Sequence, residues 1–151
     1  YSIERPLHFG ASLASGSNLA AYSGYGIPLG EAFQLRDDLL GVFGNPEQTG
    51  KPAGDDLREG KRTVLIAATL ERSPAAVKNR VNSLLGKVDL SASEVEELRG
   101  IITTSGAADF VEEMITRLTT ESLQALNTGT ITTDAKAFLV HMADVATKRK
   151  Y

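Results

Sequence analysis

Apolar residues recur along this chain at the three- and four-residue spacing of an α-helix, and no clear run alternates as a β-strand would. The spacing predicts helices over residues 2–15, about 18–43, 61–70, 74–85, 92–104, 107–126 and from about 134 onward. We therefore predict an all-α fold.

Several residues predict where these helices begin, bend or end. Pro28 lies inside the second helix, which therefore either kinks there or restarts with Pro28 at its first position. Ser73 before a proline predicts the start of another helix. Ser91 and Glu94 form the pattern of a capping box. Residues 44–60, rich in glycine and proline, predict a long polar loop, which in a compact domain is usually functional or disordered.

The two C-terminal helices carry apolar stripes that predict their buried faces. In the first, the stripe comprises Ala107, Phe110, Val111, Met114, Leu118 and Ala125. In the last helix, we expect Phe138, Leu139, Met142 and Val145 to be buried.

Two adjacent aspartates interrupt the apolar surface of the helix predicted over 32–43. Asp37 and Asp38 share one face with Gln34, at spacings of three and four residues. Buried carboxylates are costly unless they are paired or coordinate a cation, and Mg²⁺ suits one or two carboxylates with waters and phosphates. The alternative is that both aspartates simply face solvent, as charged residues mostly do.

The segment after this helix adds lysines and glycines. Lysine binds phosphate as a point charge, and glycine lets the backbone approach a ligand closely. Taken singly, Lys51 and Lys61 are each best interpreted as solvated loop charges. A carboxylate stripe followed by lysines, however, suits a metal-bridged diphosphate with cations on both sides.

Composition excludes some classes of function. The 151 residues, enough for one domain, carry a formal net charge of −3, which argues against a nucleic-acid binder driven by bulk charge. The absence of cysteine excludes a disulfide framework and favours a cytoplasmic protein. No apolar run approaches the ~18 residues of a transmembrane segment, and no signal peptide is recognisable.

The order of motifs over residues 30–61 resembles the trans-prenyl diphosphate synthases, the polyprenyl synthetase family. The matching residues are Gly30, Phe33, Gln34, Asp37, Asp38, Leu39 and Leu40, then Thr49, Gly50, Lys51 and Pro52, then Gly54, Asp56, Leu57, Gly60 and Lys61. They correspond to the region of the family's second aspartate-rich motif. The resemblance extends over the whole chain, residues 1–151, as the C-terminal part of a polyprenyl synthetase domain.

The resemblance implies an isoprenoid-synthase-type helical bundle that joins an allylic diphosphate to isopentenyl diphosphate, making geranylgeranyl or a related polyprenyl diphosphate. In this family Mg²⁺ assists departure of the allylic diphosphate, and the double bond of isopentenyl diphosphate attacks the resulting carbocation. By resemblance, Asp37 and Asp38 would bind Mg²⁺, and Lys51 and Lys61 would bind the allylic diphosphate. Gln34 would line the site near the reacting carbons. Asp56 would support the metal shell or position a lysine.

The chain departs from the family pattern in two respects. The third aspartate of the motif falls at position 41, where this chain has Gly41. The family's first aspartate-rich motif, expected in an N-terminal half, is absent. We therefore expect a parent enzyme of roughly twice this length and an inactive chain when alone. A homodimer is expected, through apolar faces that the missing half leaves exposed.

Two alternatives remain open at this stage. A non-catalytic prenyl-synthase-like subunit or helical interaction module is favoured by Gly41 and by the missing first motif. A terpene cyclase also uses aspartates, a metal and a diphosphate, but the two-lysine segment and the Phe33-Gln34 context disfavour it.

Overall fold

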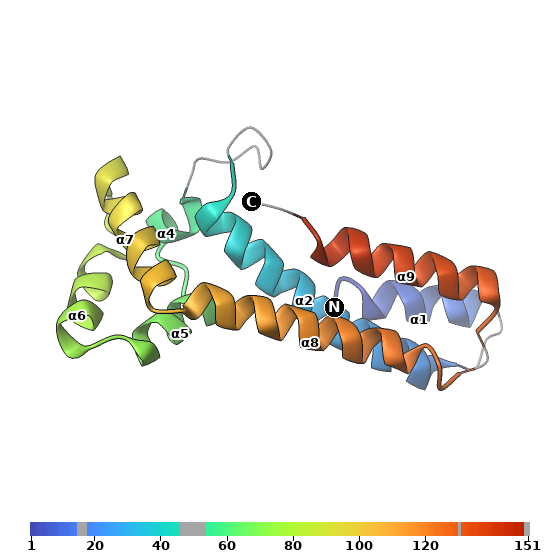
Figure 1. The fold of residues 1–151 in the computed structure, drawn as a ribbon. Helices are drawn as coiled ribbons and strands as arrows, with labels where there is room; N and C mark the ends of the chain where they lie inside the picture. The colour runs from blue at the N-terminus through green and yellow to red at the C-terminus, as the bar shows by residue number, and fades with distance from the viewer. Residues whose placement is uncertain (15–17, 46–53, 130, 150–151) are drawn as a thin grey trace. The chain divides into compact units, whose positions relative to one another are not determined.

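A computed structural model of the chain describes residues 1–14, 18–45, 54–129 and 131–149. Across these ranges the regular structure consists of helices without strands (Figure 1), which confirms the all-α prediction. The chain divides into two compact units. Unit 1 comprises residues 1–34 and 114–149, and unit 2 is built on residues 35–113.

Unit 1 is held together by one apolar cluster. Its helices are α1 (Glu4–Leu13), the first part of α2 (Leu19–Phe43), the second part of α8 (Ala107–Ala125) and α9 (Thr133–Thr147). The buried residues of this apolar core are Tyr25, Leu29, Leu126, Leu139 and Ala143. The Tyr25 hydroxyl donates to the carbonyl of Leu139 at 2.7 Å, so α2 and α9 are joined by a hydrogen bond as well as by packing.

Helix α2 continues through Pro28. Proline cannot donate to the carbonyl of Gly24 four residues earlier, which usually weakens a helix. The next carbonyl, that of Tyr25, accepts a hydrogen bond from the Ser122 hydroxyl of α8 at 2.9 Å. Pro28 itself is buried, and the helix runs 25 residues from Leu19 to Phe43. Of the two sequence interpretations, a restart at Pro28 is therefore wrong.

The buried face predicted for α9 is largely wrong. Leu139 is buried, as expected, but Phe138, Met142 and Val145 are 62%, 43% and 53% exposed. The packed face is set by Leu139 and Ala143, four residues apart, and the other three lie on an adjacent stripe of the helix. No described residue of unit 1 covers that stripe fully.

Unit 2 contains the end of α2, the first part of α8 and four short helices between them. The four short helices are α4 (Asp55–Glu59), α5 (Val64–Arg72), α6 (Ala75–Leu84) and α7 (Ala92–Thr104). The predicted polar loop over 44–60 is therefore wrong at its C-terminal end, while residues 46–53 lie outside the described residues. Gly54 and Gly60 flank α4 with φ of +72° and +71°, so these glycines cap a helix and do not mark a loop.

The start of α6 differs from the sequence prediction. Ser73 is the C-cap of α5, and Pro74 is the N-cap of α6 without a side-chain hydrogen bond. The residue before a proline is disfavoured in the α region, and Ser73 is extended, at φ −95° and ψ 149°. This conformation ends α5 at Arg72, two residues before Pro74.

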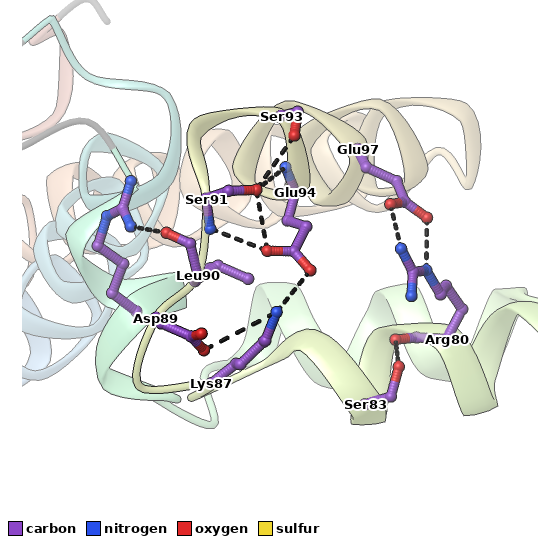
Figure 2. Close-up of polar contacts among 10 residues, drawn as sticks. Arg80, Ser83, Lys87, Asp89, Leu90, Ser91, Ser93, Glu94 and Glu97 are labelled. Atoms are coloured by element: carbon purple, nitrogen blue, oxygen red, sulfur yellow. Dashed lines mark hydrogen bonds and ion pairs between the residues drawn. The ribbon is translucent and has the colours of Figure 1, made fainter.

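The start of α7 follows the prediction. Ser91 Oγ accepts from the Glu94 N–H, and Glu94 reaches back to the Ser91 N–H, which is a complete capping box. Lys87 Nζ donates to Glu94 Oε1 at 2.9 Å, so a cation joins the group (Figure 2). We call Lys87, Ser91 and Glu94 the α7 network.

Candidate functional site

Three charged side chains of unit 2 meet at one point. Lys61 Nζ lies 2.9 Å from Asp38 Oδ1 and 3.0 Å from Asp56 Oδ2. Asp38 comes from α2, Asp56 from α4, and Lys61 lies between α4 and α5. Both aspartates are buried, at 5% and 6% exposure, whereas the Lys61 side chain is 40% exposed. We call these three residues the buried cluster.

Glycines and backbone hydrogen bonds place Lys61 in this cluster. The Lys61 N–H donates to the carbonyl of Asp56 at 3.0 Å, directly after the positive-φ Gly60. A Cβ on Gly60 would lie 2.9 Å from the Cα of Gly86, so the two backbones meet where no side chain fits. The chain is thus turned sharply after α4, which brings Lys61 back over Asp56.

The electrostatics of the cluster explain why two carboxylates can be buried together. Two nearby carboxylates repel each other, and removing them from water adds a further cost. Burial lowers the pKa of the Lys61 ammonium, but the hydrogen bonds and charges of Asp38 and Asp56 outweigh it and raise the pKa. Lys61 is therefore held as a cation between the two aspartates.

The predicted site residues fall into different environments. Gln34 is exposed, Asp37 is half-buried and Asp38 is buried. The three residues predicted to share one face of the helix therefore differ in their exposure to solvent. The solvated-face interpretation is wrong for Asp38. The Lys61 side chain is 40% exposed, as a solvated charge would be, but its ammonium also bridges two carboxylates. Lys51 lies outside the described residues.

Sequence reasoning missed two arginines that fix the helices around the cluster. Arg36 is buried on α2 and forms a two-pronged ion pair with Glu112 of α8, at 2.6 and 2.7 Å. Arg99 of α7 donates from Nε to the carbonyl of Val42 at 2.7 Å, which satisfies a carbonyl in the last turn of α2. A charged residue inside an apolar helical run was the available signal for Arg36.

The oxygen donors present fit one part of a magnesium site. Mg²⁺ keeps several waters and is commonly held by one or two carboxylates together with substrate phosphates. The half-buried Asp37 carboxylate could act as such a ligand. Asp38 accepts a hydrogen bond from Lys61 through Oδ1. Within the described ranges, no three His, Cys, Asp or Glu side chains gather around a common metal position.

Comparison with known families decides the relationship. The family model for polyprenyl synthetase matches residues 1–102. The chain belongs to the polyprenyl synthetase family. It is 34% identical over 149 residues to a short chain isoprenyl diphosphate synthase of Methanothermobacter thermautotrophicus, covering 94% of this chain. It is 32% identical over 112 residues to a geranylgeranyl diphosphate synthase of Mycobacterium tuberculosis, covering 74% of this chain and 31% of that protein.

Solved structures give the same fold. A geranylgeranyl pyrophosphate synthase of Corynebacterium glutamicum, complexed with isoprenyl diphosphate and magnesium, superposes with a TM-score of 0.94 at 45% identity over 99% of this chain. The chain spans 43% of that structure and 43% of the Methanothermobacter relative, which is less than half of either. Within the described ranges, no helix combines the length and the apolarity that crossing a membrane requires.

Proposed function

We propose that the full-length gene product is a prenyltransferase that condenses an allylic diphosphate with isopentenyl diphosphate, and that this chain supplies part of its diphosphate site. The observation that carries the proposal is the burial of Asp38 and Asp56 around Lys61, next to Asp37, in a chain of the polyprenyl synthetase family. Buried like charges are costly to a fold and are commonly found at functional sites.

The chemistry of this reaction asks for positive charge around a departing diphosphate and for a dry surface around the carbocation. Bound Mg²⁺ would neutralise the diphosphate as it leaves. Asp37 would hold the metal most directly, with Asp38 beside it, as the sequence predicts. Gln34 would lie near the reacting carbons. Lys51 would bind the allylic diphosphate from the segment between α2 and α4.

Lys61 is proposed to bind the same diphosphate. An ammonium has three N–H donors, and two of them are directed to Asp38 and Asp56. The third remains for a phosphate oxygen, and the side chain is 40% exposed. The two carboxylates then serve to aim the ammonium, and the flexible lysine stem does not have to be ordered by the substrate.

The product is proposed to be geranylgeranyl or a related polyprenyl diphosphate, because relatives with 32% and 45% identity are named geranylgeranyl synthases. A cytoplasmic homodimer is proposed as well. The exposed stripe of Phe138, Met142 and Val145 on α9 is an apolar surface of the kind that an assembly covers. Light scattering on the full-length gene product tests this state, and a monomer at all concentrations would contradict it.

The decisive experiment is a prenyl-transfer assay on the full-length gene product with Mg²⁺, isopentenyl diphosphate and geranyl or farnesyl diphosphate. We expect product formation that is abolished by a chelator and reduced about 10²-fold or more by Asp37→Asn. Arg80→Gln, on the exposed surface of α6, is the matched control and should retain activity. A full-length protein that folds, binds both substrates and transfers nothing would instead favour a non-catalytic subunit.

A further inference from the structure

Position 41 is the point where α2 meets the carboxylate of Asp56. A Cβ built on Gly41 would lie 2.3 Å from Asp56 Oδ2, 2.4 Å from Cγ and 2.8 Å from Oδ1. Real Cβ atoms do not approach other heavy atoms this closely. The Asp56 carboxylate thus occupies the place from which any side chain at position 41 would project.

The Asp56 carboxylate has little freedom to move away. Asp56 is buried at 6% exposure, and its Oδ2 atom accepts from Lys61 at 3.0 Å. The helix that carries it, α4, is capped at its N-terminus by Gly54, where a Cβ would lie 2.6 Å from Cγ1 of Val95 on α7. Because α4 is packed closely at this end, a side chain at position 41 would have to displace the carboxylate itself.

Two other helical glycines, Gly30 and Gly100, lack this constraint. A Cβ on Gly100, within α7, or on Gly30, within α2, would have no neighbour within 4 Å. Glycine in a helix interior is unfavourable relative to alanine, so a glycine without a close neighbour can be replaced with a gain in stability. Gly41 is equally unfavourable for the helix, but replacing it with alanine would create a clash with the Asp56 carboxylate.

We propose that Gly41 is a positioning residue: its lack of a side chain admits the Asp56 carboxylate, which holds Lys61 against Asp38 and aims the ammonium at the bound diphosphate. Asp56 of α4 thereby places its carboxylate beside position 41 of α2, where glycine supplies no carboxylate of its own. This inference rests on the proposed function for its consequence in catalysis, whereas its geometric part is independent of catalysis.

A double-mutant cycle between Gly41→Ala and Asp56→Ala tests the coupling in the full-length gene product. If Gly41→Ala acts by displacing Asp56, it should raise the diphosphate KM about tenfold in the wild-type background and change it less than twofold once Asp56 is alanine. The kcat value should change less than KM, because the positioned group binds the diphosphate. Gly100→Ala should leave both constants unchanged and slightly raise the unfolding temperature. Independent, multiplicative effects of the two changes would overturn the proposal.

A second readout does not need activity. The acetylation rate of Lys61, followed by mass spectrometry, reports how firmly its ammonium is held between the two carboxylates. Gly41→Ala should speed acetylation of Lys61 several-fold and leave Lys78 on α6 unchanged, since Lys78 lies outside the cluster. An unchanged Lys61 rate would overturn the proposal.

The two readouts separate failure of the inference from failure of the proposed function. If the wild-type protein transfers no prenyl group but Gly41→Ala still releases Lys61, the geometry holds and the proposed function fails. If Gly41→Ala does not fold, the Gly41→Ala/Asp56→Ala protein decides. Recovery of folding in the double variant supports the proposed contact, and failure of both variants to fold overturns it.

Discussion

Unit 2 contains two groups of charged residues that are built in opposite ways. The α7 network is exposed and is assembled from Lys87, Ser91 and Glu94, within eight consecutive residues (Figure 2). The buried cluster joins Asp38 to Lys61 across 23 positions and encloses two carboxylates that repel each other. A helix cap explains the first group completely. Local folding does not explain the second, which is why we propose that it serves the function of the protein.

Removing the cation from the buried cluster should have the largest effect. Lys61→Met leaves Asp38 and Asp56 buried together without a counter-charge. We expect a loss of about 2 kcal/mol in the free energy of unfolding, below the value for a fully enclosed pair because Lys61 is 40% exposed. Urea unfolding of the full-length gene product measures it.

The control for this change keeps the charge. Lys61→Arg should recover most of the stability but not the activity, because the guanidinium does not reproduce the compact ammonium between two carboxylates. A Lys61→Met protein as stable as the wild type would show that the cluster is not coupled as its distances indicate.

Removing the cap from the α7 network should have a smaller effect. Ser91→Ala deletes the acceptor for the Glu94 N–H and should cost about 1 kcal/mol of unfolding free energy. Prenyl-transfer activity at room temperature should not change, since these hydrogen bonds join Lys87, Ser91 and Glu94 to one another and not to the buried cluster. Loss of activity without loss of stability would break the distinction between the two groups.

The smallest expected effect is confined to acid. The hydrogen bond from Lys87 and those from Ser91 lower the pKa of Glu94 from 4.5 to about 2. A lowered folded-state pKa gives stability that is present above pH 4.5 and is lost as pH falls toward 2. Glu94→Gln should therefore flatten this part of the stability–pH curve, measured by denaturation at several pH values. Lys87→Met should move the same transition upward in pH, and a curve that neither variant changes would contradict the account.

The features predicted from sequence are those that short segments determine. The capping box at Ser91 and the helical periodicity depend on residues within one or two turns, and both are confirmed. The face of α9 depends on which neighbours pack against it, so periodicity alone placed Phe138 inside when it is exposed. Helix α2 continues through Pro28, and the nearby carbonyl of Tyr25 accepts from Ser122 of α8, a long-range contact that no local signal predicts.

The candidate site shows the same limit. The adjacent aspartates were recognisable because they interrupt an apolar run, and the burial of Asp38 agrees with that signal. From the sequence, Gly41 was interpreted only as the loss of the third aspartate of the family motif. The sequence could not indicate that Asp56, from another helix, fills the space that glycine leaves, because that contact depends on the packing of α4 against α2.

The most direct test compares the two groups in one measurement. Acetylation of Lys61 and of Lys87 is followed in the full-length gene product, with and without Mg²⁺ and inorganic pyrophosphate. If the buried cluster belongs to a diphosphate site, the ligands should slow acetylation of Lys61 several-fold and leave Lys87 unchanged. Equal rates for Lys61 with and without the ligands, in protein shown to bind pyrophosphate, would contradict the assignment.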